Sequence, residues 1–147
     1  MDVIEETMEK WHQHLRGQLP GGMDELLHDD CVFYSPVVFT PQRGKAITKM
    51  YLEAAGQALP GEPAAGGSGQ SNNEAPGSFR YTKKILSGQQ AALEFETTVE
   101  GKVVNGIDII SCDADGKIIE FKVLIRPLQG VQAVHRQMGA MLESMQG

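Results

Sequence analysis

Apolar residues recur at helical spacing near both ends of the chain. Spacings of three or four positions predict a first helix that ends near Gly17, a short second helix over residues 23–28 and a third over residues 44–59. The same spacing after Pro127 predicts a C-terminal helix over residues 129–146, with a stripe of methionines on its apolar side. The chain is therefore expected to begin and end in helices.

The middle of the chain shows the patterns typical of strands. A short apolar run predicts a strand over residues 31–34, and alternating apolar and polar residues predict strands over residues 79–86 and 91–100. Residues 103–127 predict two more strands joined by a turn at residues 113–116, whose final glycine tolerates a positive φ. This last pair is expected to form a β-hairpin.

Helices followed by a run of strands predict an α+β fold. We expect one curved sheet, mixed or antiparallel, wrapped around the N-terminal helices to form a cone, and a C-terminal helix beside it. A length of 147 residues fits a single domain over 1–147. Residues 60–77 hold no side chain more apolar than alanine and are expected to form a mobile loop. That loop is either a plain surface insertion or a lid.

Asp108 is the most informative residue of the predicted hairpin. A four-residue turn pairs Cys112 with Lys117 and sets Asp108 opposite Phe121, on a face that is otherwise apolar. A carboxylate there loses hydration, which raises its pKa, and such shifts are common at functional sites. Asp108 either faces a pocket or is a structural aspartate that is hydrogen-bonded to a buried partner.

Composition and charge exclude several classes of partner. The net charge is −6, and no basic stripe is interleaved with aromatic residues, so nucleic acid is not an expected partner. No apolar run approaches the roughly 20 residues of a membrane span, and the N-terminus is acidic, so we expect a cytoplasmic protein without a membrane partner. Cys31 and Cys112 lack any ligand spacing and are expected to be reduced and apolar, with no metal site.

Several local sequences, spread over nearly the whole chain, resemble one group of proteins. They are residues 11–15, residues 26–33 before Ser35, Gly44, residues 106–108 and residues 115–118. In their order and spacing they resemble the ketosteroid isomerase-like and SnoaL-like families of the nuclear transport factor 2-like superfamily. The resemblance implies a cystatin-like cone with a hydrophobic pocket, and a homodimer that pairs through the outer face of the sheet.

The resemblance also bears on the site. It implies that Asp108 corresponds to the protonated acid that donates a hydrogen bond to a developing oxyanion, a role for which the isomerase is a known example. Ser35 stands where the isomerases hold their proton-shuttling aspartate, and Trp11 replaces a tyrosine. Since a serine hydroxyl is too weak a base, steroid isomerisation by the family mechanism is not expected. Gly106 stands where epoxide opening would call for an arginine, which disfavours that chemistry too.

Other residues complete the candidate site. His14, in the first helix, is the candidate partner of Asp108, and the two are hypothesised to act as acid and base. His12, His28 and His135 are interpreted as surface or packing residues. The candidate substrate-binding residues are Trp11, Tyr34, Ser35, Tyr51, Phe95, Ile110, Phe121 and Val123. The alternative is that the apolar members of this set are simply core.

Two function classes remain. The first is a protein that binds a small hydrophobic molecule, carbonyl-bearing and steroid- or polyketide-like, and converts it by general acid–base chemistry as an isomerase, cyclase or hydrolase without metal or organic cofactor. The second is a non-catalytic module, either a ligand carrier or a dimerising interaction domain. An open cavity reached by Asp108 would favour an enzyme or a carrier, and a cavity plugged by side chains would favour an interaction domain.

Overall fold

The computed structural model describes residues 2–59 and 78–146. The proposed loop at residues 60–77 lies outside the described residues. The helices are α1 (Val3–Leu15), α2 (Met23–Leu26), α3 (Lys45–Ala58) and α4 (Leu128–Gln146). The strands are β1 (Leu27–Tyr34), β2 (Gln42–Arg43), β3 (Arg80–Ser87), β4 (Gln90–Val99), β5 (Lys102–Cys112) and β6 (Ile118–Arg126).

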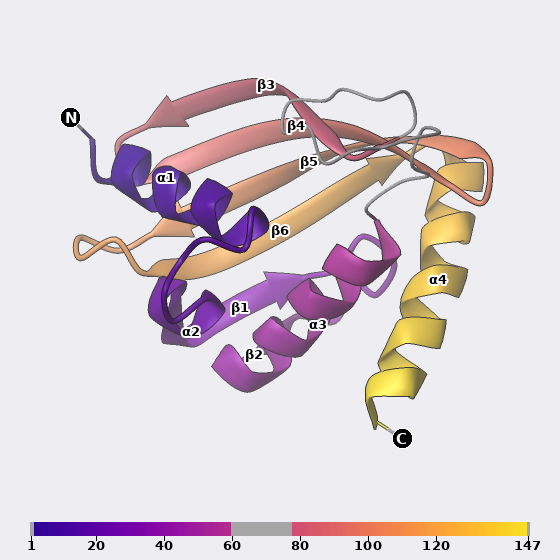
Figure 1. The fold of residues 1–147 in the computed structure, drawn as a ribbon, viewed down its shortest axis with the longest axis horizontal. Helices are drawn as coiled ribbons and strands as arrows, with labels where there is room; N and C mark the ends of the chain where they lie inside the picture. The colour runs from indigo at the N-terminus through magenta and orange to yellow at the C-terminus, as the bar shows by residue number, and fades with distance from the viewer. Residues whose placement is uncertain (1, 60–77, 147) are drawn as a thin grey trace.

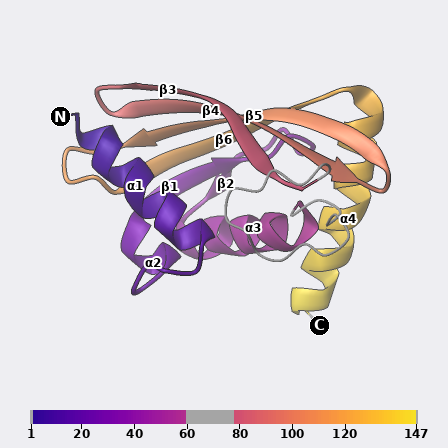
Figure 2. The same cartoon turned by 45° about the horizontal axis from the view of Figure 1, so that its top comes forward.

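The strands form one mixed sheet that curves over the helices. The order is β2-β1-β6-β5-β4-β3, with β1 parallel to β6 and the other neighbours antiparallel (Figure 1). The sheet arches over α1 and α3, and α4 lies at one end (Figure 2). The predicted α+β cone is therefore confirmed.

The sequence misplaced the start of the first strand. The second helix ends at Leu26 rather than at residue 28, and β1 begins at Leu27 rather than at Cys31. The polar run His28-Asp29-Asp30 hides this half of the strand, because it lacks apolar alternation. Strand β2, only two residues long, was not predicted, since so short a segment carries no period.

The predicted register of the hairpin is wrong by two residues. Asp108 pairs with Val123, not with Phe121, and Phe121 pairs with Ile110. Because side chains alternate with a period of two along a strand, a shift of two residues returns each side chain to the same face. Asp108 therefore keeps the face that the sequence predicted and changes only its neighbour.

The loop between β5 and β6 explains the shift. One carboxylate oxygen of Asp113 accepts hydrogen bonds from the backbone N–H groups of Asp115 and Lys117, each at 2.9 Å. These bonds draw Lys117 into the turn, so that Cys112 pairs with Ile118 across an irregularity. The longer turn accounts for one residue of the shift, and the irregularity between Ser111 and Cys112 accounts for the other.

The core lies between the concave face of the sheet and the helices. Trp11 of α1, Phe33 of β1 and Phe121 of β6 are buried there, and the Trp11 and Phe121 rings lie 5.1 Å apart. Helix α4 adds Val134 and Met138, which belong to its predicted apolar side. Both cysteines are free and buried, as expected.

Gly106 allows β5 to lie close under an aromatic ring. A Cβ atom at this position would overlap the Phe95 ring and lie 2.8 Å from the carbonyl oxygen of Leu124. Both neighbours are constrained, since Phe95 is buried in the core and Leu124 belongs to the sheet backbone. The glycine thus lets the Phe95 ring cover the strand that carries Asp108.

Gly106→Ala is accordingly expected to lower the free energy of unfolding by about 1–3 kcal/mol, because the added methyl group overpacks the core. The measurement is urea unfolding. Gly139→Ala is the matched control, since nothing lies within 4 Å of its added Cβ and alanine favours the helix interior by up to about 1 kcal/mol. Equal effects of both substitutions would show that Gly106 is not under steric constraint.

The convex face of the sheet exposes apolar side chains. Val103, Leu124 and Ile85 are 64%, 50% and 59% exposed. The homodimer implied by the family resemblance would use this face, and it stays a prediction. No helix within the described residues has the length and apolar character needed to cross a membrane.

A candidate acid–base site in the cone

A cavity of about 590 Å³ lies between the concave face of the sheet and the helices. Its wall is mostly apolar and aromatic, with Phe33, Phe79, Phe95 and Phe121 among its members. Among the described residues of the wall, Asp108 is the one acid. Such a mostly apolar cavity with few polar groups is typical of a small-molecule site.

Burial dominates the chemistry of Asp108. The residue is only 6% exposed and lies on the cavity wall. Burial raises the pKa of its carboxyl group from 3.8 to about 7, and a hydrogen bond from Tyr81 acts in the opposite direction. At neutral pH the carboxyl group therefore exists in both its charged and its neutral form.

A chain of two hydrogen bonds holds this carboxyl group. The Tyr81 hydroxyl donates to Oδ2 of Asp108 at 2.8 Å, and Nε1 of Trp11 donates to the Tyr81 oxygen at 3.0 Å. Burial and the nearby Asp108 raise the pKa of Tyr81 well above its usual range, so it remains a donor. Tyr81 thus engages one carboxyl oxygen, Oδ2, and restrains the orientation of the acid.

Ser35 also lies on the wall, at the end of β1. Its hydroxyl oxygen accepts hydrogen bonds from the backbone N–H groups of Val37 at 3.1 Å and Val38 at 3.3 Å. These bonds organise the turn through Pro36. The hydroxyl therefore has a structural use where the resembled isomerases hold a carboxylate.

Many solved structures are similar to this one, whereas no protein-family model and no curated protein matches the chain. A steroid delta-isomerase from Pseudomonas aeruginosa has 29% identity and a TM-score of 0.81, with 99% of this chain and 95% of that chain covered. An NTF2-like protein of unknown function from Mesorhizobium loti has 17% identity and a TM-score of 0.64, with 85% and 92% covered. An epoxide hydrolase/cyclase-like enzyme of pyran ring formation in salinomycin has 16% identity and a TM-score of 0.54, with 83% and 92% covered.

The chain has the SnoaL-like and ketosteroid isomerase-like form of the nuclear transport factor 2-like fold. The neighbours with this fold include an isomerase and a hydrolase/cyclase-like enzyme, which is consistent with a ligand-binding cone. The likeness to the isomerase extends over almost the full length of both chains. Shared architecture alone does not assign a reaction, since this kind of scaffold hosts unrelated chemistries.

The nuclear transport factor 2-like cone brings some of the predicted site residues to the cavity wall. Six of them line it: Trp11, Ser35, Phe95, Asp108, Phe121 and Val123. Ile110 is fully buried opposite Phe121, Tyr51 of α3 stacks on Phe33 at 5.4 Å, and Tyr34 lies beneath the Lys122 ammonium group at 4.9 Å. None of these three is a residue of the described wall.

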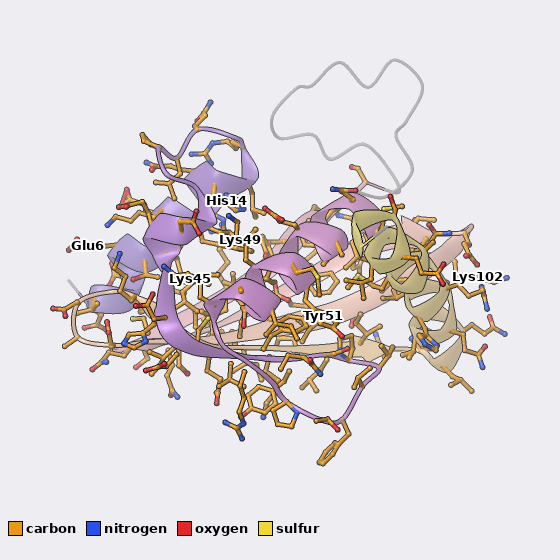
Figure 3. The ribbon with its side chains drawn as sticks, turned by 90° about the horizontal axis from the view of Figure 1, so that it is seen from below. Glu6, His14, Lys45, Lys49, Tyr51 and Lys102 are labelled. Carbon is orange, nitrogen blue, oxygen red and sulfur yellow. The ribbon has the colours of Figure 1, made fainter. Side chains whose placement is uncertain are left out.

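His14 and Asp108 are not joined by a hydrogen bond or ion pair within the described structure. His14 belongs to α1 (Figure 3), and its ring centroid is 5.5 Å from that of Trp11. It is not among the residues of the described wall, and burial lowers its pKa. Within the described structure, Tyr81 is the side chain that bonds to the Asp108 carboxyl group. The dyad of Asp108 with His14 stays a hypothesis that this geometry does not favour.

The sequence reasoning missed four polar residues of the wall: His12, Arg16, Tyr81 and Lys84. Tyr81 could have been found, because it faces Phe95 across β3 and β4 and so shares a face with Asp108. His12 was interpreted as a surface or packing residue. Burial lowers its pKa to about 4, with contributions from Lys84 and Arg16, so its imidazole is neutral at pH 7.

Metal-binding chemistry has no obvious ligand set in the described structure. Among residues 2–59 and 78–146, no group of three or more histidine, cysteine, aspartate or glutamate side chains is arranged to hold a metal ion. The groups that the cavity offers to a ligand are thus a carboxyl group, hydroxyl groups, a neutral imidazole and two cations.

Proposed function

We propose that the cavity binds a small hydrophobic molecule that carries a carbonyl group, and that Asp108 transfers protons to and from that molecule without a metal or organic cofactor. The observation that carries this proposal is the buried carboxyl group on the cavity wall, whose pKa of about 7 matches the pH of the cell. General acids and bases work best when their pKa lies near the working pH.

The chemistry follows from the two forms of Asp108. The carboxylate accepts a proton from the carbon next to a ligand carbonyl group, which leaves an enolate and a neutral carboxylic acid. The acid then returns the proton to the same carbon or to another carbon of the conjugated system. After the carboxylic acid has exchanged its proton with water, return to the same carbon incorporates a solvent proton, and return elsewhere gives an isomer. Tyr81 keeps the carboxyl group oriented through both steps.

The likeness to a steroid delta-isomerase supports a ligand of steroid size. The cavity volume of about 590 Å³ also suits a molecule of several fused rings. Ser35 cannot supply the second acid–base group of the resembled isomerases, since its hydroxyl is a weak base that already accepts two backbone hydrogen bonds. Asp108 would therefore both remove and return the proton.

A carrier without catalytic activity is the second candidate. It is favoured by the same engaged Ser35 hydroxyl, because a carrier needs only one polar group to orient its guest. A dimerising interaction domain is less well supported, since such a domain has no need of a cavity of this volume.

The test measures ligand binding and proton exchange in the same protein. We expect androstenedione and β-tetralone to raise the melting temperature, because a ligand at 100 times its Kd stabilises the native state by about 2.7 kcal/mol. In D2O we expect the protein to speed deuterium incorporation next to their carbonyl groups, as followed by mass spectrometry. Binding without exchange would identify a carrier. Absence of both effects would refute the proposed function.

A further inference from the structure

The rim of the cavity is positively charged in a chain whose net charge is −6. The two cations of the described wall are Arg16 and Lys84, and both are exposed enough to reach solvent. The one acid of that wall, Asp108, is buried and already bonded to Tyr81. A site for a plain hydrophobic ketone needs neither cation.

Lys84 reaches the cavity because β3 is irregular. Tyr81 pairs with Phe95, but Lys83 pairs with Glu94 and Lys84 with Leu93, so one extra residue is accommodated between Tyr81 and Lys83. Without this bulge, strict alternation from Tyr81 would place Lys84 on the convex face. Bulges of this kind re-aim side chains and are common beside active sites. The bulge in β3 thus directs the Lys84 side chain toward the cavity.

Arg16 reaches the same rim from the end of α1. It follows His12 by one helical turn, so both side chains lie on the same side of the helix. The ring centroid of His12 is 5.7 Å from that of Tyr81, which places this side of α1 against β3. Both cations lower the pKa of His12, as expected if they stand near the same imidazole. His12 itself stays neutral and adds no charge.

Neither cation forms an ion pair among the described residues. Arg16 donates from Nε to the Gln18 side-chain oxygen at 3.2 Å, a neutral partner. Arg16 and Lys84 lie on the wall of the same cavity and carry like charges, so a bound anion would be attracted by both. A guanidinium group and an ammonium group together offer the charge-assisted hydrogen bonds that a carboxylate prefers.

We propose that the ligand is an amphipathic acid, whose carboxylate binds Arg16 and Lys84 at the rim while its hydrophobic ring body fills the cavity toward Asp108. This inference rests on the proposed function, because it places the carbonyl end of the same molecule at Asp108. The carboxylate adds a second point of recognition to the carbonyl group, and two such points fix the orientation of the bound ligand.

The experiment compares each acid with its own methyl ester. The probes are oxoetienic acid, a steroid enone whose D ring carries a carboxylate, and naphthylacetic acid, each measured by titration calorimetry beside its ester. We expect the wild-type protein to bind each acid about tenfold more tightly than the ester, a difference that shrinks as salt is added. In the Arg16→Gln, Lys84→Gln double variant we expect the acid to lose about tenfold in affinity and the ester to lose nothing.

The matched control is the Lys10→Gln, Lys83→Gln double variant. It removes the same charge from the same two elements, but neither residue belongs to the cavity wall. We expect it to leave the ratio of acid to ester affinity unchanged. Equal binding of acid and ester, or a ratio that both double variants lower alike, would overturn the amphipathic acid while leaving the proposed function standing. Failure of all four compounds to bind would overturn the amphipathic acid, and the proposed function falls only if androstenedione and β-tetralone also fail to bind and to exchange.

Discussion

Asp108→Asn is expected to make the protein more stable above neutral pH, although it removes the candidate catalytic group. Burial raises the pKa of this carboxyl group from 3.8 to about 7, so ionising it in the folded state costs free energy. Asparagine has nearly the same shape, can accept the hydrogen bond from Tyr81 and carries no charge. The variant therefore avoids the cost of the buried charge.

The gain in stability expected from Asp108→Asn depends on pH. Below pH 3.8 the carboxyl group is protonated in the folded and the unfolded protein, and its pKa shift has no effect. Between pH 3.8 and about 7 the unfolded chain releases the proton while the folded protein keeps it, so each rise of one pH unit lowers the free energy of unfolding by about 1.36 kcal/mol. Above about pH 7 the full cost, on the order of 4 kcal/mol at most, is present.

Urea unfolding of both proteins at about pH 5 and about pH 8 measures the effect. The difference between variant and wild type is needed, because His12 titrates in the opposite sense. Its pKa is lowered from 6.5 to about 4, so its contribution to stability is present above pH 6.5 and is lost as the pH falls toward 4. Asp115→Asn, at an exposed position of the β5–β6 turn, should match the wild type at both pH values.

Loss of function should accompany the gain in stability. Asp108→Asn is expected to slow deuterium exchange of a bound ketone by at least about 100-fold, since general acid–base catalysis contributes that much or more. A variant that is less stable than the wild type at pH 8 would show that the buried carboxylate does not destabilise the fold. A variant that keeps full exchange would show that the carboxyl group is not catalytic.

Tyr81→Phe is expected to move the pH dependence of exchange toward higher pH. The hydroxyl group of Tyr81 donates to the Asp108 carboxylate and so holds the pKa of that group below the value that burial alone would give. Its removal raises the pKa further and reduces the carboxylate fraction at neutral pH. It also leaves Nε1 of Trp11 without its acceptor, which should cost about 1–3 kcal/mol of stability.

The measurement is the exchange rate as a function of pH, together with urea unfolding. Tyr51→Phe is the control, because the Tyr51 ring packs on Phe33 and is not part of the described cavity wall. We expect the control to keep the wild-type pH midpoint. If Tyr81→Phe lowers stability but leaves the midpoint unchanged, Tyr81 supports the fold without tuning Asp108.

The sequence was sufficient to predict the architecture and the face of the sheet on which Asp108 lies. Periodicity located three of the four helices and four of the strands closely, because all of these elements except β3 bury one side against the core. Asp108 stood out because a single charge on an apolar face needs an explanation. A two-residue error in register left that inference intact, since it preserved the face.

The features that the sequence did not predict depend on irregular backbone and on contacts between distant segments. The inward turn of Lys84 results from a bulge, and no alternation pattern reveals one. The candidate partner of Asp108 predicted from the sequence is His14, because the first helix is expected to cover the sheet. The actual donor, Tyr81, lies on β3 and shares a face with Asp108, and the strand order β5-β4-β3 brings the two side chains together.

The parallel pairing of β1 with β6 has a consequence for how this protein is made. Phe33 and Phe121 stand opposite each other across that pairing, although nearly 90 positions of sequence, 33 to 121, separate them. A ribosome must therefore release the chain through β6 before this side of the cavity can form, and contacts of such long range form slowly. The early apolar residues of the chain stay exposed until β6 emerges, so the cavity can bind a ligand only after that point.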